Sequence, residues 1–292
     1  MVRLAVMCAT LLAPRQAASH GGMLMPHATI NGFSMHYQLH GPEAGEPLVL
    51  VHGYTGDLGD FFDQIDEFSK THRVLVMDHR GHGDSEGPDD HASYTILQMA
   101  DDVEAIAAHV GFGRYHLAGH SMGGAVVQEI ALRSGNRLMS LTLFGTSSNF
   151  KLGSVPAVVA WMEARNKLAL EEGMAAVAAM PQMMPDPPHM PAGRRDYEKA
   201  RTLRMSPHGL AGGWNALATW EGTTDRITNI TTPSLLMAGA LEPAAKTVPR
   251  MHEQISGSTM LIIPESGHSP QFERPEIFNE ALRAHLARNA AR

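Results

Sequence analysis

The stretch Gly119-His120-Ser121-Met122-Gly123-Gly124 determines how the rest of this sequence is interpreted. It stands between the segment 114–118, which has the character of a strand, and the segment 125–130, which has the character of a helix. A Gly-x-Ser-x-Gly spacing in this context is typical of a nucleophile elbow. Because the chain turns sharply there, the serine is strained, and a side chain at position 119 or 123 would clash with neighbouring elements. The pattern predicts that Ser121 is a nucleophile raised at the end of a strand.

Strand-like and helix-like segments alternate on both sides of this stretch. Residues 27–41 form a predicted β-hairpin, because Asn31-Gly32 is a tight-turn signal between two short alternating runs. Continuous apolar runs predict buried strands, and helical spacing of apolar residues predicts amphipathic helices. The alternation predicts an α/β fold with a mostly parallel central sheet and helices on both faces. The expected strands are 47–51, 73–77, 115–118, 138–144, 234–237 and 259–263, and the expected helices are 58–70, 96–110, 122–133, 244–255 and 275–287.

One segment, from 149 to 224, contains no buried-type strand and has helical stretches around the proline-rich run 181–191. It holds all 3 tryptophans and many methionines, side chains that either pack in a core or line an apolar pocket. The candidates for substrate contact are Trp161, Met183 and Trp214. We expect an N-terminal extension at 1–26, an α/β core at 27–148 and 225–292, and a helical cap at 149–224.

Composition excludes several classes of protein. The chain has 292 residues, 43% of them hydrophobic, and a formal net charge of −7. It is long enough to bury a full-sized core, and it has no general attraction for nucleic acid or for anionic membranes. The single cysteine, Cys8, excludes an intramolecular disulfide. The 17 histidines include no His-Glu-x-x-His pattern, and we expect neither a metal nor a cofactor.

The first residues leave two interpretations open. Met1-Val2-Arg3 and the apolar run 4–13 resemble a secretory signal, with small residues at 17–19 for cleavage. Pro14 and Arg15 interrupt that pattern, which favours an upstream start codon and a working protein that begins near Met23 or Met25. The second interpretation predicts a cytoplasmic protein, and the first a secreted or periplasmic one. The apolar run is too short to span a bilayer, and we expect no membrane association.

Two backbone amides are candidates for stabilising an oxyanion. The N–H of Met122 lies at the start of the predicted helix after Ser121, where donors are unpaired and the helix dipole favours negative charge. The N–H of Tyr54 is the second candidate, since Gly53 lets the loop after the strand 47–51 approach the site. We interpret His52 in that loop as a structural residue.

Three segments together carry a resemblance to a known family. His52-Gly53, the segment Asp78-His79-Arg80-Gly81-His82-Gly83-Asp84-Ser85 and the elbow at 119–123 each follow a predicted strand. In this respect the chain resembles the α/β-hydrolase superfamily, and within it small serine esterases and lactonases with a helical cap. The resemblance implies that Asp78, Arg80 and His82 fix a loop. Epoxide hydrolases and haloalkane dehalogenases share the pattern with an aspartate as nucleophile, so serine at 121 disfavours both activities.

The family order of nucleophile, acid and histidine suggests the other two catalytic residues. His268 stands in the Gly-containing loop 264–270 after the last expected strand and is the candidate general base. Glu242 follows the penultimate strand, where relatives usually carry an aspartate, and is the candidate acid that orients the histidine. His252 and His285 fall on expected helices, and we expect both at the surface.

The resulting functional hypothesis is hydrolysis of a carboxylic ester or lactone with a largely apolar acyl part, through an acyl-enzyme on Ser121. Carbon–carbon bond hydrolysis of a ring-cleavage product is an alternative. Its substrates carry a carboxylate, for which the cap offers only arginines that we interpret as a solvated helix face: Arg194, Arg195, Arg201 and Arg204. Haloperoxidase side activity and a non-catalytic ligand receptor are further alternatives. The expected partner is a small molecule, and a homodimer is left open.

Overall fold

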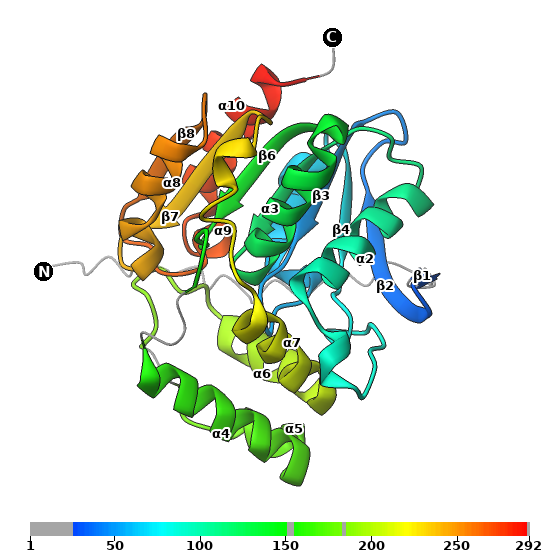
Figure 1. The fold of residues 1–292 in the computed structure, drawn as a ribbon, viewed down its shortest axis with the longest axis vertical. Coiled ribbons are helices and arrows are strands. Elements are labelled where there is room, and N and C mark those ends of the chain that lie inside the picture. The colour runs from blue at the N-terminus through cyan, green and yellow to red at the C-terminus, as the bar shows by residue number, and fades with distance from the viewer. Residues whose placement is uncertain (1–25, 151–154, 183–184, 291–292) are drawn as a thin grey trace, which may run out of the picture.

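An eight-stranded sheet runs through the protein (Figure 1). The computed structural model describes residues 26–150, 155–182 and 185–290. The strand order in the sheet is β1-β2-β4-β3-β5-β6-β7-β8. The strands are β1 (His27–Ile30), β2 (Phe33–His40), β3 (Glu46–Val51), β4 (His72–Met77), β5 (Tyr115–His120), β6 (Leu138–Phe144), β7 (Ser234–Gly239) and β8 (Thr259–Ile263).

The sheet is antiparallel only at its N-terminal edge. Strands β1 and β2 form the expected hairpin, and Asn31 and Gly32 take positive φ angles of 49° and 90°, as a primed two-residue turn requires. Strand β2 is antiparallel to β4, and all later pairs are parallel. Val51 pairs with both Met77 and Gly119, so β3, β4 and β5 end level with one another. The loops that follow these strands therefore meet at one edge of the sheet.

Helices cover both faces of the sheet, which confirms the expected fold class (Figure 1). One face packs against α2 (Ile96–His109), α3 (Met122–Ser134) and α8 (Val248–Gln254), and the other against α1 (Phe62–Phe68) and α10 (Pro275–Arg288). The sequence of α2 shows why it packs: Ile96, Met99, Val103 and Ile106 recur at helical spacing and are all buried. A short helix, α9 (Pro270–Glu273), precedes α10.

Two of the expected helices begin with a 3-10 turn. The segment expected at 58–70 is a 3-10 turn, Leu58–Phe61, followed by α1, and the segment expected at 244–255 is a 3-10 turn, Pro243–Lys246, followed by α8. Asp57 caps the first of these turns by accepting a hydrogen bond from the amide of Gly59. None of the helices within the described ranges combines the length and the apolar character needed to cross a lipid bilayer.

Four helices between β6 and β7 lie outside the sheet layers, at the bottom of Figure 1. They are α4 (Pro156–Glu172), α5 (Met174–Ala178), α6 (Arg194–Arg204) and α7 (Pro207–Thr219). Helices α4, α5 and α7 share a small apolar cluster that includes Ala169, Met174 and Leu210. Gly81, in the loop after β4, lies directly against Gly209 of α7. The helical segment therefore packs through α7 on a loop at the carboxyl edge of the sheet.

The interpretation of the α6 arginines as a solvated face was wrong for Arg194 and Arg201, whereas Arg204 is exposed. Arg194 is buried and, like Arg201, donates to the buried carboxylate of Asp60. Arg204 donates to Asp57, at 3.0 Å. The acceptors lie about 140 residues away in the sequence, at separations of 134, 141 and 147. The positions of the charged residues within α6 alone therefore could not predict these ion pairs.

Candidate active site

Ser121 lies on the strained bend that the sequence predicted. It stands between β5 and α3 with φ 53° and ψ −116°, a conformation rarely adopted by residues other than glycine. A Cβ at Gly119 would collide with the carbonyl of Gly123, and a Cβ at Gly123 would collide with the carbonyl of Val51. Both glycines are therefore required by close packing, and the bend presents Ser121 at the carboxyl edge of the sheet.

Three residues from separate loops meet at this bend. The Nε2 atom of His268 lies 2.9 Å from the Oγ atom of Ser121, and its Nδ1 atom lies 2.6 Å from the Oε2 atom of Glu242. His268 follows β8 and Glu242 follows β7, so the carboxyl ends of three strands contribute. The glutamate side chain is buried, and its Oε1 atom accepts a hydrogen bond from the amide of Gly239 at 3.2 Å. The longer side chain of glutamate thus reaches the imidazole at the position where an aspartate was expected.

The surroundings of His268 change its proton affinity. Desolvation by the surrounding protein lowers the pKa of His268, but the charge of Glu242 and its hydrogen bond to Nδ1 raise it more, so the pKa lies above the usual 6.5. At a pH above this value the ring is neutral, and its Nε2 atom faces the serine hydroxyl as a proton acceptor.

Two side chains that the sequence did not identify hold the His268 loop. His120 donates from Nε2 to the carbonyl oxygen of His268 at 2.8 Å. Glu273 accepts hydrogen bonds from the amides of Gly267 and Ser269 and from the hydroxyl of Ser266. Both residues position His268 by hydrogen bonds to the main chain of its loop. The signals available in the sequence were weak: His120 is the variable position of the elbow motif, and Glu273 is an ordinary acidic residue four positions after Ser269.

The two candidate oxyanion donors lie next to Ser121. Met122 is the first residue of α3, and Tyr54 follows Gly53 in the loop after β3. A Cβ at Gly53 would stand 3.0 Å from the Cβ of Ser121, which shows how closely this loop approaches. Among the described residues, none accepts a hydrogen bond from the amide of Tyr54 or Met122. Thr55, the next residue of this loop, adopts a positive φ of 61°.

Buried histidines brace the loops beneath the site. His52 accepts from the amide of His79 at 2.9 Å, which agrees with its interpretation as a structural residue. His79 packs edge-on against it and His82 lies tilted beside it, and burial lowers the pKa of His82 to about 3. His285 was expected at the surface, but that expectation was wrong: it is buried on α10, and burial lowers its pKa to about 4.

The segment 78–85 after β4 serves as a loop anchor. The carboxylate of Asp78 accepts hydrogen bonds from the amides of Leu58 and Asp84, at 2.8 and 3.0 Å, and contacts Nδ1 of His36 at 2.7 Å. Within the described ranges, His36, Asp78 and Asp84 are the group whose spacing fits a metal ion. Both carboxylate oxygens of Asp78 already accept hydrogen bonds from these donors, and Asp84 is exposed. These contacts are those of a structural anchor.

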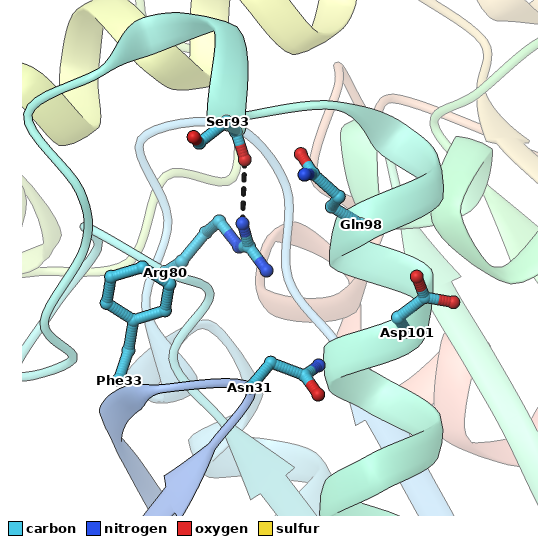
Figure 2. Close-up of a pocket in the computed structure, with 6 residues that line it drawn as sticks. All are labelled: Asn31, Phe33, Arg80, Ser93, Gln98 and Asp101. Atoms are coloured by element: carbon cyan, nitrogen blue, oxygen red, sulfur yellow. Dashed lines mark hydrogen bonds between the residues drawn. The ribbon is translucent and has the colours of Figure 1, made fainter.

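A separate pocket lies beside α2 and the hairpin (Figure 2). It has a volume of about 370 Å³. Its lining contains none of Ser121, His268 and Glu242; the lining residues are Asn31, Phe33, Arg80, Ser93, Gln98 and Asp101. Arg80 is the charged centre of this pocket, and it already donates to Asp102 and to the carbonyl of Ser93. The pocket is therefore distinct from the site at Ser121.

The helices α4 and α7 contact the site loop through Tyr54. The Tyr54 hydroxyl donates to the carbonyl of Leu210 at 2.9 Å and lies 3.3 Å from Oδ1 of Asn166. The guanidinium of Arg165 lies 5.9 Å from the centre of the Tyr54 ring and 5.4 Å from that of the Trp161 ring. Among the expected substrate contacts, Trp161 is half-buried in this group and Trp214 is buried on α7. Met183 lies outside the described residues.

Known proteins are similar in sequence to this chain. A putative carbamate hydrolase RutD from Variovorax paradoxus is 30% identical over 273 residues, covering 88% of this chain and 97% of that protein. A dihydrolipoyllysine-residue acetyltransferase component of an acetoin cleaving system from Pseudomonas putida is 29% identical over 260 residues. That match covers 85% of this chain, which spans only 65% of the length of the relative.

Structural comparison gives a consistent result. The crystal structure of the enol-lactonase from Burkholderia xenovorans LB400 matches with a TM-score of 0.78 and 26% identity, covering 90% of this chain and all of that one (100%). The family model for the alpha/beta hydrolase fold matches residues 46–275, which extend from β3 to the start of α10. With strand order, elbow and family model in agreement, the chain belongs to the α/β-hydrolase family.

Proposed function

We propose that this protein hydrolyses a carboxylic ester or lactone through an acyl-enzyme on Ser121. The observation that carries the proposal is the continuous chain of contacts from the Ser121 hydroxyl through the His268 ring to the Glu242 carboxylate, at 2.9 and 2.6 Å. A serine hydroxyl is a weak nucleophile unless a base takes its proton. Here the base is in place, and a buried acid fixes its orientation.

In the first half of the reaction, Oγ of Ser121 attacks the carbonyl carbon while its proton passes to Nε2 of His268. The negative charge moves to the carbonyl oxygen, where the amides of Met122 and Tyr54 donate hydrogen bonds. Loss of one such donor typically lowers the rate by about 10²–10³. The tetrahedral intermediate then expels the alkoxide, which takes the proton from His268, and the acyl group stays on Ser121.

The second half repeats these steps with water. His268 removes a proton from a water molecule, which attacks the acyl carbonyl, and the collapse of the intermediate returns the proton to Ser121. Glu242 stays ionised throughout and stabilises the imidazolium by its hydrogen bond to Nδ1. In a lactone the alkoxide is part of the same molecule, so one ring opens to a hydroxy acid by the same chemistry. The similarity to an enol-lactonase supports this class of substrate.

Helices α4–α7 would act as a cap over the acyl part of the substrate. They contact the Tyr54 loop directly, and α4, α5 and α7 contribute an apolar cluster next to it. Trp161 and Trp214 lie on α4 and α7, the two helices that contact Tyr54. An apolar acyl chain packs favourably against such side chains. We therefore propose a substrate with an apolar stretch next to the scissile carbonyl.

A second candidate reaction is carbamate hydrolysis. It is favoured by the 30% identity to a putative carbamate hydrolase across 97% of that protein. The attack on the carbonyl carbon is the same, but the bond that breaks is C–N and the leaving group is an amine or ammonia. Comparing the wild-type kcat/KM for alcohol release from an ester with that for direct ammonia release, without loss of the alcohol, from the carbamate of the same alcohol distinguishes the two.

Labelling with a fluorophosphonate probe tests the proposal. Wild-type protein should be labelled at Ser121 and should hydrolyse 4-nitrophenyl butyrate, and Ser121→Ala should lose both properties. Ser134→Ala, which alters a serine at the far end of α3, is the matched control and should keep both. Absence of labelling and turnover in a folded wild-type protein would favour a ligand receptor over an enzyme.

A further inference from the structure

One arginine next to the site lacks a carboxylate partner. Arg165, on α4, is half-buried. Within residues 26–150, 155–182 and 185–290, no hydrogen bond or ion pair joins it to another side chain, and its contacts are the two aromatic rings. The remaining positions of the chain contain no aspartate or glutamate. No acidic side chain of this protein therefore neutralises the Arg165 charge.

The other arginines of the same helical segment are satisfied. Arg194 and Arg201 share the buried carboxylate of Asp60, and Arg195 pairs with Asp186 and Glu198. Partly buried guanidinium groups are costly without a counter-charge. Against this background, the unpaired state of Arg165 indicates that its partner comes from outside the chain.

The position of Arg165 connects it with the nucleophile. Gly53 touches Ser121, Tyr54 follows Gly53, and the Arg165 guanidinium lies over the Tyr54 ring. The Trp161 ring contacts the same guanidinium, one helical turn earlier on α4. The two rings fix the orientation of the planar group and exclude water from part of it, but they carry no net charge. Burial lowers the pKa of Arg165, so an anion placed beside it would relieve an existing cost.

We propose that Arg165 binds a carboxylate of the substrate, so that the ester or lactone carries a negative charge beyond the apolar stretch. The planar fork of an arginine matches a carboxylate with two parallel hydrogen bonds, a geometry that lysine cannot reproduce. The inference rests on the proposed function, because it assumes that the substrate carbonyl lies at Ser121. Arg165 is then a specificity-determining residue that makes no contact with the reacting atoms.

A pair of esters that differ in charge and by one methyl group tests this. One is the mono-4-nitrophenyl ester of adipic acid, which ends in a carboxylate, and the other is its neutral methyl ester. The protein variants are Arg165→Gln, which removes the charge, and Arg165→Lys, which keeps the charge without the fork. Arg195→Gln removes a paired arginine of α6 and is the matched control. Urea unfolding of each variant checks that it folds.

Wild type should prefer the charged ester in kcat/KM by about 10-fold to 100-fold, the range that a charge-assisted contact supplies. Arg165→Gln should lose that preference through a higher KM for the charged ester, while kcat/KM for the neutral ester stays within about 3-fold. Arg165→Lys should keep part of the preference, and Arg195→Gln all of it. Free adipate should inhibit the wild type more strongly than Arg165→Gln.

Two outcomes would overturn the assignment of Arg165 alone. One is hydrolysis of the neutral ester by wild type without preference for the charged one. The other is an equal loss of activity on both esters in Arg165→Gln, which would show a purely structural role for the contact with Tyr54. Failure of wild type to hydrolyse either ester, together with no labelling of Ser121, would instead contradict the proposed function.

Discussion

His120 donates a hydrogen bond to the main-chain carbonyl of His268, with 2.8 Å between Nε2 and the oxygen. The same ring stacks on Phe144 at a centroid distance of 5.2 Å, so it is held from both sides. The residue that precedes the proposed nucleophile thus fixes the backbone of the proposed base. This link therefore helps to position His268 relative to Ser121.

Removing this link should slow the chemistry without weakening substrate binding. In His120→Phe the ring volume is kept and the donor is lost. We expect kcat to fall about 5-fold, since one hydrogen bond contributes about 1 kcal/mol and 1.36 kcal/mol is a factor of ten in rate. KM for 4-nitrophenyl butyrate should stay unchanged. His109→Phe, at an exposed position on α2, is the control, and equal kcat values for the two variants would contradict the positioning role.

Glu242→Gln should lower kcat and change the pH dependence of kcat/KM. Without the carboxylate the imidazolium loses its main stabilisation, and a triad of this kind loses up to about 10⁴ in kcat when its acid becomes an amide. Because Glu242 raises the pKa of His268, the acid limb of the wild-type kcat/KM profile should lie above pH 6.5. In Glu242→Gln the limb should move to lower pH. An unchanged limb would show that another group titrates there.

Acid should unfold the protein through its buried histidines. Burial lowers the pKa of His82 and His120 to about 3 and that of His285 to about 4, so all three are neutral in the folded state at neutral pH. The unfolded chain binds their protons near pH 6.5. The contribution of these three histidines to the free energy of unfolding should therefore be constant above pH 6.5 and decrease as the pH falls towards 3 to 4.

The His285→Gln variant tests how much one of these histidines contributes to the pH dependence of the free energy of unfolding. Each such group contributes a slope of about 1.4 kcal/mol per pH unit between its two pKa values. Urea unfolding at pH 5, 6 and 7 should give a shallower decrease for His285→Gln than for wild type. A parallel decrease in both proteins would show that His285 takes no part.

The pairs between α6 and the loop after β3 should contribute strongly to stability. Two arginines, Arg194 and Arg201, converge on the buried carboxylate of Asp60 and hold its pKa well below the usual range. In Asp60→Asn both cations lose their counter-charge, and breaking a buried pair in this way costs about 3–5 kcal/mol. Glu67→Gln breaks a surface pair with Arg283 and should cost about 1 kcal/mol or less. Similar urea midpoints for the two variants would argue against a structural role for Asp60.

Local motifs made most of the sheet and the core of the site predictable from the sequence. Apolar runs and helical periodicity identified the strands of the parallel sheet and its covering helices, because each signal lies within about fifteen neighbouring residues. Ser121, Glu242 and His268 were found for a related reason: each stands in a loop that directly follows a strand, and parallel strands bring such loops to one edge.

Contacts between distant side chains were not predictable in the same way. The pairing of Asp60 with two arginines of α6, the bond from His120 to His268 and the placement of Arg165 over Tyr54 each join residues more than 100 positions apart. By residue type alone, the aspartate and the arginines would be expected to be exposed charges, and His120 an ordinary histidine. His285 was misplaced because its helix pattern shows amphipathicity without showing which polar residue lies at the boundary of the buried face.

The most direct test of the account is to identify the covalent intermediate. Wild-type protein mixed with excess 4-nitrophenyl butyrate and quenched in acid within milliseconds should yield a peptide containing Ser121 whose mass is increased by one butyryl group. The adduct should be absent from Ser121→Ala. A wild-type protein that hydrolyses the ester while the acyl group is found on another residue would contradict the assignment of Ser121 as the nucleophile.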